Sequence, residues 1–343
     1  MDDYKERKYL SAIEVARYLG ITVKQVHSLL KSGKLKGFKA ASGQYRFDLR
    51  DVKEIEEHIH GSNKIEAEMP IKTENIISIN GTTQTVYVKD ARDMKEIKDN
   101  SVHLMITSPP YFNAKLYSTI EGDLGNIHDL DEWFNEIGKV WKEVFRVLQP
   151  GRKAFINIMN LPVRTKHGFK SLNIVGRTID LCESIGFIFR REIIWHKTNS
   201  VRAHFGTYPY PGNINYAHEF ILEFEKPAPK NYKKYEHLTE EQKEASKLER
   251  DFWIEIKKSD VWRIKPEGSG DNRDHPAPFP YELPYRLIKA YSFVGETVLD
   301  PFLGSGTTLV VARDLKRNGI GYEINPEIAK EAIRKIKNFQ QKL

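Results

Sequence analysis

The sequence predicts an α/β fold, a doubly wound and mostly parallel sheet with helices on both faces, and a smaller unit of another kind in front of it. From residue 76 onward, short apolar runs alternate with longer stretches whose apolar residues recur every three or four positions. This alternation is typical of strands joined by crossover helices. Residues 9–59 lack it, and the stretch after them contains Gly61 and Pro70, as a linker would. The predicted boundaries are 1–60 for the N-terminal domain, 61–75 for the linker and 76–343 for the larger domain.

Each element of the larger domain is predicted from a local pattern. Strands are expected where apolar or β-branched residues run together, and helices where apolar residues keep a helical spacing. The predicted strands are Thr85–Val88, Val102–Ile106, Ala154–Ile158, Phe187–His196, Thr297–Leu299 and Gly319–Glu323. The predicted helices are Asp131–Leu148, Ile174–Ile185, Pro284–Tyr291 and Thr307–Leu315. The rhythm breaks over residues 199–270, which we interpret as an insertion on the sheet that carries a charged helix at 239–258.

Residues 9–59 have the pattern of two short helices followed by a small β-ribbon. Ser11 and Glu14 form a predicted capping box at the start of the first helix, which Gly20 ends, and Thr22 caps the second. Two helices joined by a tight turn indicate a helix-turn-helix. Strands within 33–38 and 43–47 and a helix from Asp51 complete the pattern, which resembles the winged helix-turn-helix of the excisionase and MerR-type families. The resemblance implies that DNA is contacted by Lys24, Gln25, His27, Ser28 and Arg46. The alternative is a small helical cap that packs on the larger domain.

The composition narrows the class of protein. The 343 residues carry a formal net charge of +7, which favours an anionic partner such as nucleic acid. The single cysteine, Cys182, excludes an intramolecular disulfide and a cysteine zinc cluster, and no metal site is predicted. No apolar stretch approaches the roughly 20 residues that span a bilayer. The charged N-terminus lacks a signal core. We therefore expect a cytoplasmic protein with no membrane partner.

A glycine-rich loop follows the predicted strand Thr297–Leu299. Gly304 and Gly306 let the backbone approach a ligand closely, and the loop ends where a helix begins near Thr307, whose free amides favour an anionic group. Glu323 ends the next predicted strand, where a carboxylate can accept hydrogen bonds from both ribose hydroxyls of an adenosine. These features predict a nucleotide-like ligand, but their spacing does not separate a dinucleotide from S-adenosylmethionine.

A second loop, Ser108-Pro109-Pro110-Tyr111, follows the predicted strand Val102–Ile106. The Ser108 oxygen and the Pro109 carbonyl can both accept hydrogen bonds from an exocyclic amino group, while Tyr111 offers a ring on which a base can stack. Two such acceptors favour the pyramidal form of the amino group and free its lone pair for attack on a methyl donor. A base in a duplex reaches such a pocket only when it is flipped out. The bland alternative is an ordinary proline-containing loop.

The two loops together resemble the β group of S-adenosylmethionine-dependent DNA amino-methyltransferases, in which the catalytic motif precedes the cofactor motif. The resemblance covers roughly residues 76–340 and implies that double-stranded DNA is the substrate. It implies a catalytic role for Ser108, Pro109, Pro110 and Tyr111. It implies that the cofactor is bound by Asp300, Phe302, Gly304, Gly306, Thr307 and Glu323, with Pro280 from the segment that closes over methionine. Asp90 resembles the acid that meets the adenine amino group, although Asp93 competes for that role.

The resemblance also bears on the product. Enzymes of this family that methylate adenine usually carry Asp at the first position of the catalytic motif, whereas Ser is typical of cytosine-N4 enzymes. Ser108 therefore favours N4-methylcytosine, with N6-methyladenine as the alternative. The insertion is expected to choose the DNA sequence, because it supplies side chains suited to base edges and phosphates: Arg202, His204, Tyr208, Asn213 and Asn215.

Other readings compete with this one. They are a dinucleotide-dependent oxidoreductase, a methyltransferase for RNA or protein amides, and a DNA-binding regulator whose methyltransferase domain is inactive. The sequence leaves open whether a cognate restriction endonuclease or a second copy of the chain is a partner.

Overall fold

The computed structural model divides the chain into two compact units, 1–70 and 71–343. It describes residues 9–19, 23–39, 45–53, 55, 71–112, 120, 122–198, 216–266 and 280–339. The predicted linker therefore ends earlier than expected, because Ile71 already belongs to the larger unit. Strand β4 (Glu74–Ile79) pairs with β5 (Thr82–Tyr87) and adds an antiparallel edge to the main sheet.

The N-terminal unit has the predicted helix-turn-helix elements. Helix α1 (Ala12–Tyr18) begins at Ser11 with the expected capping box, since the Ser11 hydroxyl accepts from the Glu14 amide and the Glu14 carboxylate accepts from the Ser11 amide. Helix α2 (Val23–Lys31) follows. A three-stranded sheet holds β1 (Tyr9–Ser11), β3 (Tyr45–Asp48) and β2 (Phe38–Lys39) in that order. Strand β1 is an addition that the sequence did not predict, and Leu10, Val26 and Phe47 form part of the small buried core.

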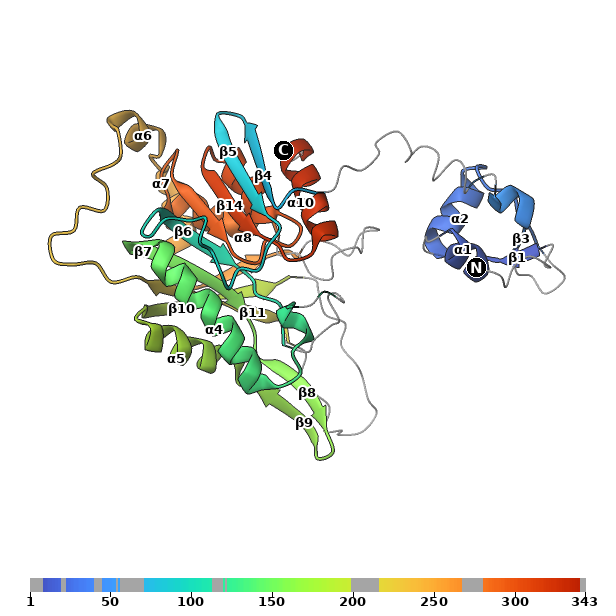
Figure 1. Cartoon of the computed structure of the whole chain (residues 1–343), viewed down its shortest axis with the longest axis horizontal. Helices are drawn as coiled ribbons and strands as arrows, with labels where there is room; N and C mark the ends of the chain where they lie inside the picture. The colour runs from blue at the N-terminus through green and yellow to red at the C-terminus, as the bar shows by residue number, and fades with distance from the viewer. Residues whose placement is uncertain are drawn as a thin grey trace. The chain divides into compact units, whose positions relative to one another are not determined.

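The larger unit is built on one nine-stranded sheet in the order β12-β10-β11-β7-β6-β13-β14-β5-β4 (Figure 1). Its five central strands from β7 to β5 are all parallel, while β4 and β11 run against their neighbours. The remaining strands are β6 (Val102–Thr107), β7 (Leu148–Ile158), β10 (Ile188–Lys197), β11 (His218–Glu225), β12 (Val261–Ile264), β13 (Thr297–Asp300) and β14 (Asn318–Tyr322).

Helices cover both faces of the sheet, as the alternation predicted. Consecutive residues of β6 point to opposite faces, so Met105 packs in the core beneath α4 (Leu130–Val147) and α5 (Ile174–Ile185). Leu104 and Ile106 pack instead in the core beneath α7 (Arg250–Lys257) and α8 (Glu282–Tyr291). The helices α9 (Thr307–Asp314) and α10 (Pro326–Asn338) enclose a further core with β4 and β5.

The expected insertion at 199–270 is wrong in its extent. Strand β11 lies within the sheet between β10 and β7, and β12 forms its edge. The predicted charged helix at 239–258 is two short helices, α6 (Glu240–Ala245) and α7, separated by residues 246–249. The buried carboxylates of Glu219 and Glu223 on β11 are paired with Lys197 and Lys153, which is why this polar stretch can lie inside the sheet.

A two-stranded hairpin between β7 and α5 was also not predicted. It consists of β8 (Leu161–Thr165) and β9 (Gly168–Leu172), which pair only with each other and extend away from the main sheet (Figure 1). Its base is fixed because Leu161 is buried and Leu172 packs against the same core. Within the described residues, no helix is long and apolar enough to cross a membrane.

Candidate active site

A cavity of about 1020 Å³, measured to include its open mouth, lies at the carboxyl edge of the parallel strands. Both loops singled out in the sequence contribute to its wall, although they are nearly 200 positions apart. This is the edge at which open α/β sheets bind ligands. Its lining includes Asp90, Ser108, Pro109, Pro110, Tyr111, Phe302, Gly304, Thr307 and Glu323.

Asp300 shapes the glycine loop from beneath and does not line the cavity. Its carboxylate accepts hydrogen bonds from the Thr107 hydroxyl at 2.7 Å, from the Thr308 hydroxyl at 2.6 Å and from the Phe302 amide at 3.1 Å. Complete burial raises the pKa of Asp300 to about 6, and these hydrogen bonds oppose the shift. Asp300 therefore holds the glycine loop from below and is not among the described lining residues, and its predicted part in binding the cofactor stays a prediction.

The two glycines serve different purposes in the loop. Gly304 lines the cavity with a φ of 52°. Gly306 has a φ of 84°, and a Cβ at this position would meet the Cβ of Ala332 at 3.1 Å and its Cα at 3.2 Å. Gly306 is therefore required where the loop crosses α10, directly before α9 begins at Thr307.

Glu323 joins the end of β14 to the glycine loop. Its Oε2 accepts a 3.0 Å hydrogen bond from the Gly304 amide, and its Oε1 accepts one of 2.9 Å from the Asn325 amide. Desolvation raises the pKa of Glu323 to about 7, with the two backbone donors acting in the opposite direction. A carboxylate has about four acceptor positions, so each oxygen can still receive a further hydroxyl proton.

The loop Ser108–Tyr111 is held by a polar network. The Ser108 hydroxyl donates a 3.2 Å hydrogen bond to the backbone carbonyl of Asn157, and the Tyr111 hydroxyl donates one of 2.7 Å to Glu219. The side-chain amide of Asn157 donates a hydrogen bond to the Glu219 carboxylate, and the Lys197 ammonium pairs with it. Sequence reasoning missed Asn157, Glu219 and Lys197. The sequence does contain a signal for them, since each is a polar residue inside or at the end of an otherwise apolar strand.

Asp90 is brought to the cavity, whereas its competitor Asp93 is not among the lining residues described. The Asp90 carboxylate is paired with Arg92, which also binds Glu136 on α4. Asp93 is mostly exposed and pairs with Lys95 at 3.0 Å.

The remaining predicted residues lie elsewhere. Pro280 is buried just before α8 and is not among the described lining residues. In the N-terminal unit, His27 is exposed on α2 and Arg46 is on β3, while the side chains of Lys24, Gln25 and Ser28 lie outside the described residues. The residues predicted to choose the DNA sequence also lie outside them: Arg202, His204, Tyr208, Asn213 and Asn215.

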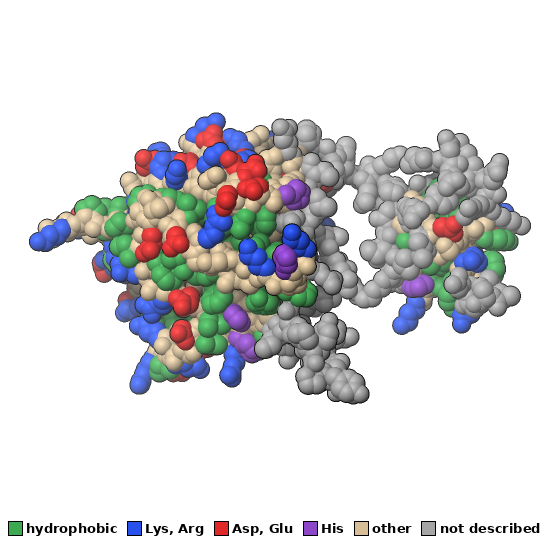
Figure 2. Space-filling model, turned by 90° about the horizontal axis from the view of Figure 1, so that it is seen from below, with side chains coloured by type: hydrophobic (Ala, Val, Ile, Leu, Met, Phe, Trp, Pro, Cys, Tyr) green, Lys and Arg blue, Asp and Glu red, His purple; other side chains and the backbone are tan. Residues whose placement is uncertain are grey.

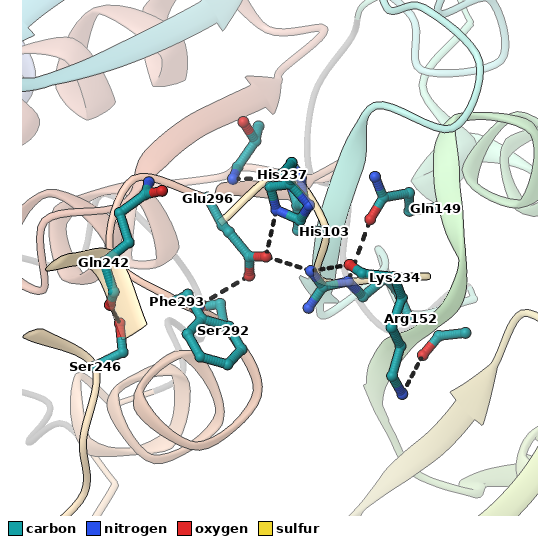
Figure 3. Close-up of polar contacts among 12 residues, drawn as sticks. His103, Gln149, Arg152, Lys234, His237, Gln242, Ser246, Ser292, Phe293 and Glu296 are labelled. Atoms are coloured by element: carbon teal, nitrogen blue, oxygen red, sulfur yellow. Dashed lines mark hydrogen bonds and ion pairs between the residues drawn. The ribbon is translucent and has the colours of Figure 1, made fainter. Parts of the chain in front are cut away.

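A second polar cluster lies at the opposite, amino edge of the same strands (Figure 3). His103, His237 and Glu296 place one potential ligand atom each within 4.8 Å of one another. Glu296 is, however, already paired with Arg152 and accepts from the Phe293 amide, while His103 Nδ1 accepts from the Thr297 amide at 3.1 Å. Burial lowers the pKa of His103 to about 3. The adjacent guanidinium and the occupied Nδ1 disfavour a metal, so this cluster is best explained as a structural tie between strands.

Comparisons with known proteins agree with the geometry of the cavity. Residues 102–334 match the family described as DNA methylase, and residues 9–57 match a helix-turn-helix domain family. The chain is 35% identical to the Type II methyltransferase M.MthZI of Methanothermobacter thermautotrophicus over 71% of this chain and 74% of that protein. It is 36% identical to M.MjaI of Methanocaldococcus jannaschii over 72% and 89%.

Solved structures extend the likeness. A Thermus thermophilus protein crystallised in complex with S-adenosyl-L-methionine aligns with a TM-score of 0.60 and 32% identity, over 73% of this chain and 92% of that one. The PvuII cytosine-N4-specific DNA methyltransferase shares the fold, with a TM-score of 0.54 and 19% identity over 76% and 88%. The family match covers more than half of the chain, and the matched residues include both loops that line the cavity. The prediction from the sequence is thus confirmed: this chain belongs to the family of S-adenosylmethionine-dependent DNA amino-methyltransferases that act on N6 or N4, and it carries an N-terminal helix-turn-helix domain.

Proposed function

We propose that this enzyme transfers the methyl group of S-adenosylmethionine to the N4 amino group of a flipped-out cytosine in double-stranded DNA. The observation that carries the proposal is that Ser108, Gly304 and Glu323 all line the same cavity. A hydrogen-bond acceptor for the amino group of a base and a carboxylate for the nucleoside of the cofactor would therefore act in one cavity. Methyl transfer between two bound molecules requires such proximity.

The lining of the cavity fits the cofactor. Glu323 retains acceptor positions for the ribose hydroxyls, and the amide-rich start of α9 at Thr307 suits the carboxylate of methionine. Asp90, which lines the same cavity, would meet the adenine amino group. When bound there, S-adenosylmethionine supplies an electrophilic methyl group.

The geometry of Ser108 supports its role as an acceptor. A hydroxyl can donate one hydrogen bond and accept two. Because the Ser108 proton points to the Asn157 carbonyl, the oxygen lone pairs are left for the amino protons of a base. Together with the Pro109 carbonyl, Ser108 would draw the amino group toward its pyramidal form and stabilise the positive charge that develops on it during attack. Tyr111, held by Glu219, would stack on the base.

The choice of cytosine over adenine rests on Ser108, since Ser at this position of the motif is typical of cytosine-N4 enzymes. The names of the relatives as Type II methyltransferases support a role within a restriction-modification system.

Nucleoside mass spectrometry tests the product. The full chain is incubated with amplified genomic DNA, which carries no methylation, and S-adenosylmethionine with a deuterated methyl group. Labelled N4-methylcytosine is expected after hydrolysis to nucleosides. Labelled N6-methyladenine would overturn the choice of base, and label in neither nucleoside, from a preparation that binds the cofactor, would overturn the proposal.

A further inference from the structure

The β8–β9 hairpin begins at the catalytic edge of the sheet. The Ser108 hydroxyl is bonded to the carbonyl of Asn157, and β8 starts only four residues later at Leu161. From that buried base the ribbon extends over four residue steps to Thr165, which is roughly 13 Å at the usual rise of a strand. The hairpin is thus an arm that projects from the edge of the sheet where the reaction takes place.

The charge of the arm is all of one sign. The segment Leu161–Leu172 contains Arg164, Lys166 and Lys170 and no acidic residue. Lys166, His167 and Lys170 are exposed. Figure 2 views the molecule from the side to which the hairpin points in Figure 1, and that face carries Lys, Arg and His side chains among apolar and acidic ones.

An aromatic ring lies among these cations. Phe169 is 60% exposed, and its Cα is opposite that of Arg164 in the backbone register of the ribbon. Its exposed ring is available to a molecule that binds the arm. The arm is also in contact with Tyr216, which directly follows Asn215, one of the residues predicted to choose the DNA sequence. The hydroxyl of Tyr216 lies 3.5 Å from that of Ser171 on β9.

We propose that the β8–β9 hairpin is a DNA-contacting arm, with Lys166 and Lys170 on backbone phosphates and Phe169 against base edges. This proposal rests on the proposed function, since it takes the DNA substrate as the partner. The major groove, about 12 Å wide, admits a two-stranded ribbon, and the methyl group of thymine is a partner for an apolar side chain there. The lysines would position the duplex, and Phe169 would contribute to the choice of sequence.

The test compares the arm with a matched site elsewhere on the full chain. Lys166→Ala/Lys170→Ala removes two exposed lysines four positions apart. Lys243→Ala/Lys247→Ala removes a half-buried and an exposed lysine with the same spacing, on and just after α6, which contacts the amino edge of the sheet through Gln242 and Val294. Phe169→Ala is compared with Ile254→Ala, which truncates a side chain that is 49% exposed on α7. Calorimetry with S-adenosylmethionine verifies that every variant is folded.

Binding to amplified duplex DNA is then measured across a range of salt concentrations, together with the KM for DNA in methyl transfer. The lysine variant of the arm should flatten the plot of log K against log salt by about 0.9 for each phosphate that is no longer bound, while the α6 variant leaves it unchanged. Phe169→Ala should raise the KM for DNA about tenfold, the scale expected when one apolar side chain is no longer covered by its partner. Slopes and KM values equal to those of the controls would overturn the proposal. If the wild type transfers no methyl group to DNA, the proposed function fails, and the salt slopes still decide whether the arm contacts DNA.

Discussion

The Tyr111 hydroxyl donates a 2.7 Å hydrogen bond to Glu219 Oε2, joining two residues that are 108 positions apart in the sequence. Tyr111 follows β6, and Glu219 is on β11, with β7 between these two strands. The same carboxylate binds Asn157 from β7 and Lys197 from β10. One buried carboxylate therefore connects four neighbouring strands at the catalytic edge and fixes the ring on which the base would stack.

Removal of this hydroxyl should weaken the hold on the ring without touching the cofactor loop. We expect Tyr111→Phe to lower the free energy of unfolding by about 1 to 3 kcal/mol, because a buried charged acceptor loses a donor. Methyl transfer should slow, and the Kd for S-adenosylmethionine should stay unchanged. Chemical denaturation and single-turnover kinetics measure the two effects.

Tyr87→Phe serves as a comparison, since the Tyr87 hydroxyl donates a 2.9 Å hydrogen bond to Glu74 on β4, the strand at the other edge of the sheet. Because Glu74 is exposed, this variant should cost less free energy of unfolding than Tyr111→Phe, and the rate of transfer should be kept. Equal loss of rate in both variants would show that Tyr111 acts only through stability.

Cofactor binding should depend on pH through Glu323. Burial raises the pKa of Glu323 to about 7, so in the free enzyme the side chain is largely protonated below pH 7. Two ribose hydroxyls favour the carboxylate form, which accepts both protons. The affinity for S-adenosylmethionine should therefore fall as the pH drops from 8 to 6 and level off above 8. Calorimetry at several pH values measures this, and Glu323→Gln should bind weakly with little pH dependence in that range. An affinity of the wild type that does not change between pH 6 and 8 would contradict the role of Glu323.

Gly306 can be tested against a second glycine of similar backbone conformation. Gly306→Ala combines a φ of 84° with crowding against Ala332, whereas Gly81→Ala has a φ of 74° and nothing within 4 Å of the added Cβ. The left-handed conformation alone costs a non-glycine residue about 1 to 2 kcal/mol. Thermal unfolding should show that loss in Gly81→Ala and a larger one in Gly306→Ala, with weaker cofactor binding only in the latter. Similar losses in both variants would show that the contact with Ala332 is unimportant.

The N-terminal unit should be separable from the catalytic one. The chain divides at Pro70, and residues 71–343 hold the whole cavity described above. A protein truncated to residues 71–343 should fold and bind S-adenosylmethionine as the full chain does. Its affinity for DNA should be lower and less sensitive to salt, by about 0.9 in log–log slope for each phosphate that the missing domain would have bound. A truncated protein with the salt slope of the full chain would remove the helix-turn-helix domain from DNA binding.

Regular periodicity explains which parts of the fold could be predicted from the sequence. The helix Ile174–Ile185 has the bounds that were expected, α4 is shifted by one residue at both ends, and α9 ends one residue earlier than expected. Their apolar spacing depends only on the local chain. Strand β11 was missed because Glu219 and Glu223 interrupt its apolar run, and their counter-charges come from other strands. The hairpin of β4 and β5 could have been predicted, because the dipeptide Asn80-Gly81 favours a tight turn between two strands. Both residues have the positive φ that such a turn requires.

The site shows the same division. The strand-end positions of Ser108 and Glu323 follow from the order of apolar runs and loops, so both could be placed at one edge of the sheet. The orientation of Asp300 could not, because it depends on hydroxyls from Thr107 and Thr308 that fold over the carboxylate. Asn157 and Glu219 stand out in the sequence as polar residues within apolar strands, but their roles could not be predicted, since these arise from pairings between strands distant in the sequence.

The central claim is that Ser108 acts on the amino group while the glycine loop and Glu323 hold the cofactor. The most direct measurement is the single-turnover rate of methyl transfer by Ser108→Ala at saturating S-adenosylmethionine, with the Kd for the cofactor measured on the same preparation. Loss of one pre-placed acceptor should lower the rate on the order of a hundredfold and leave the Kd unchanged. A rate equal to that of the wild type would contradict the claim, as would a loss of rate that is fully explained by weaker cofactor binding.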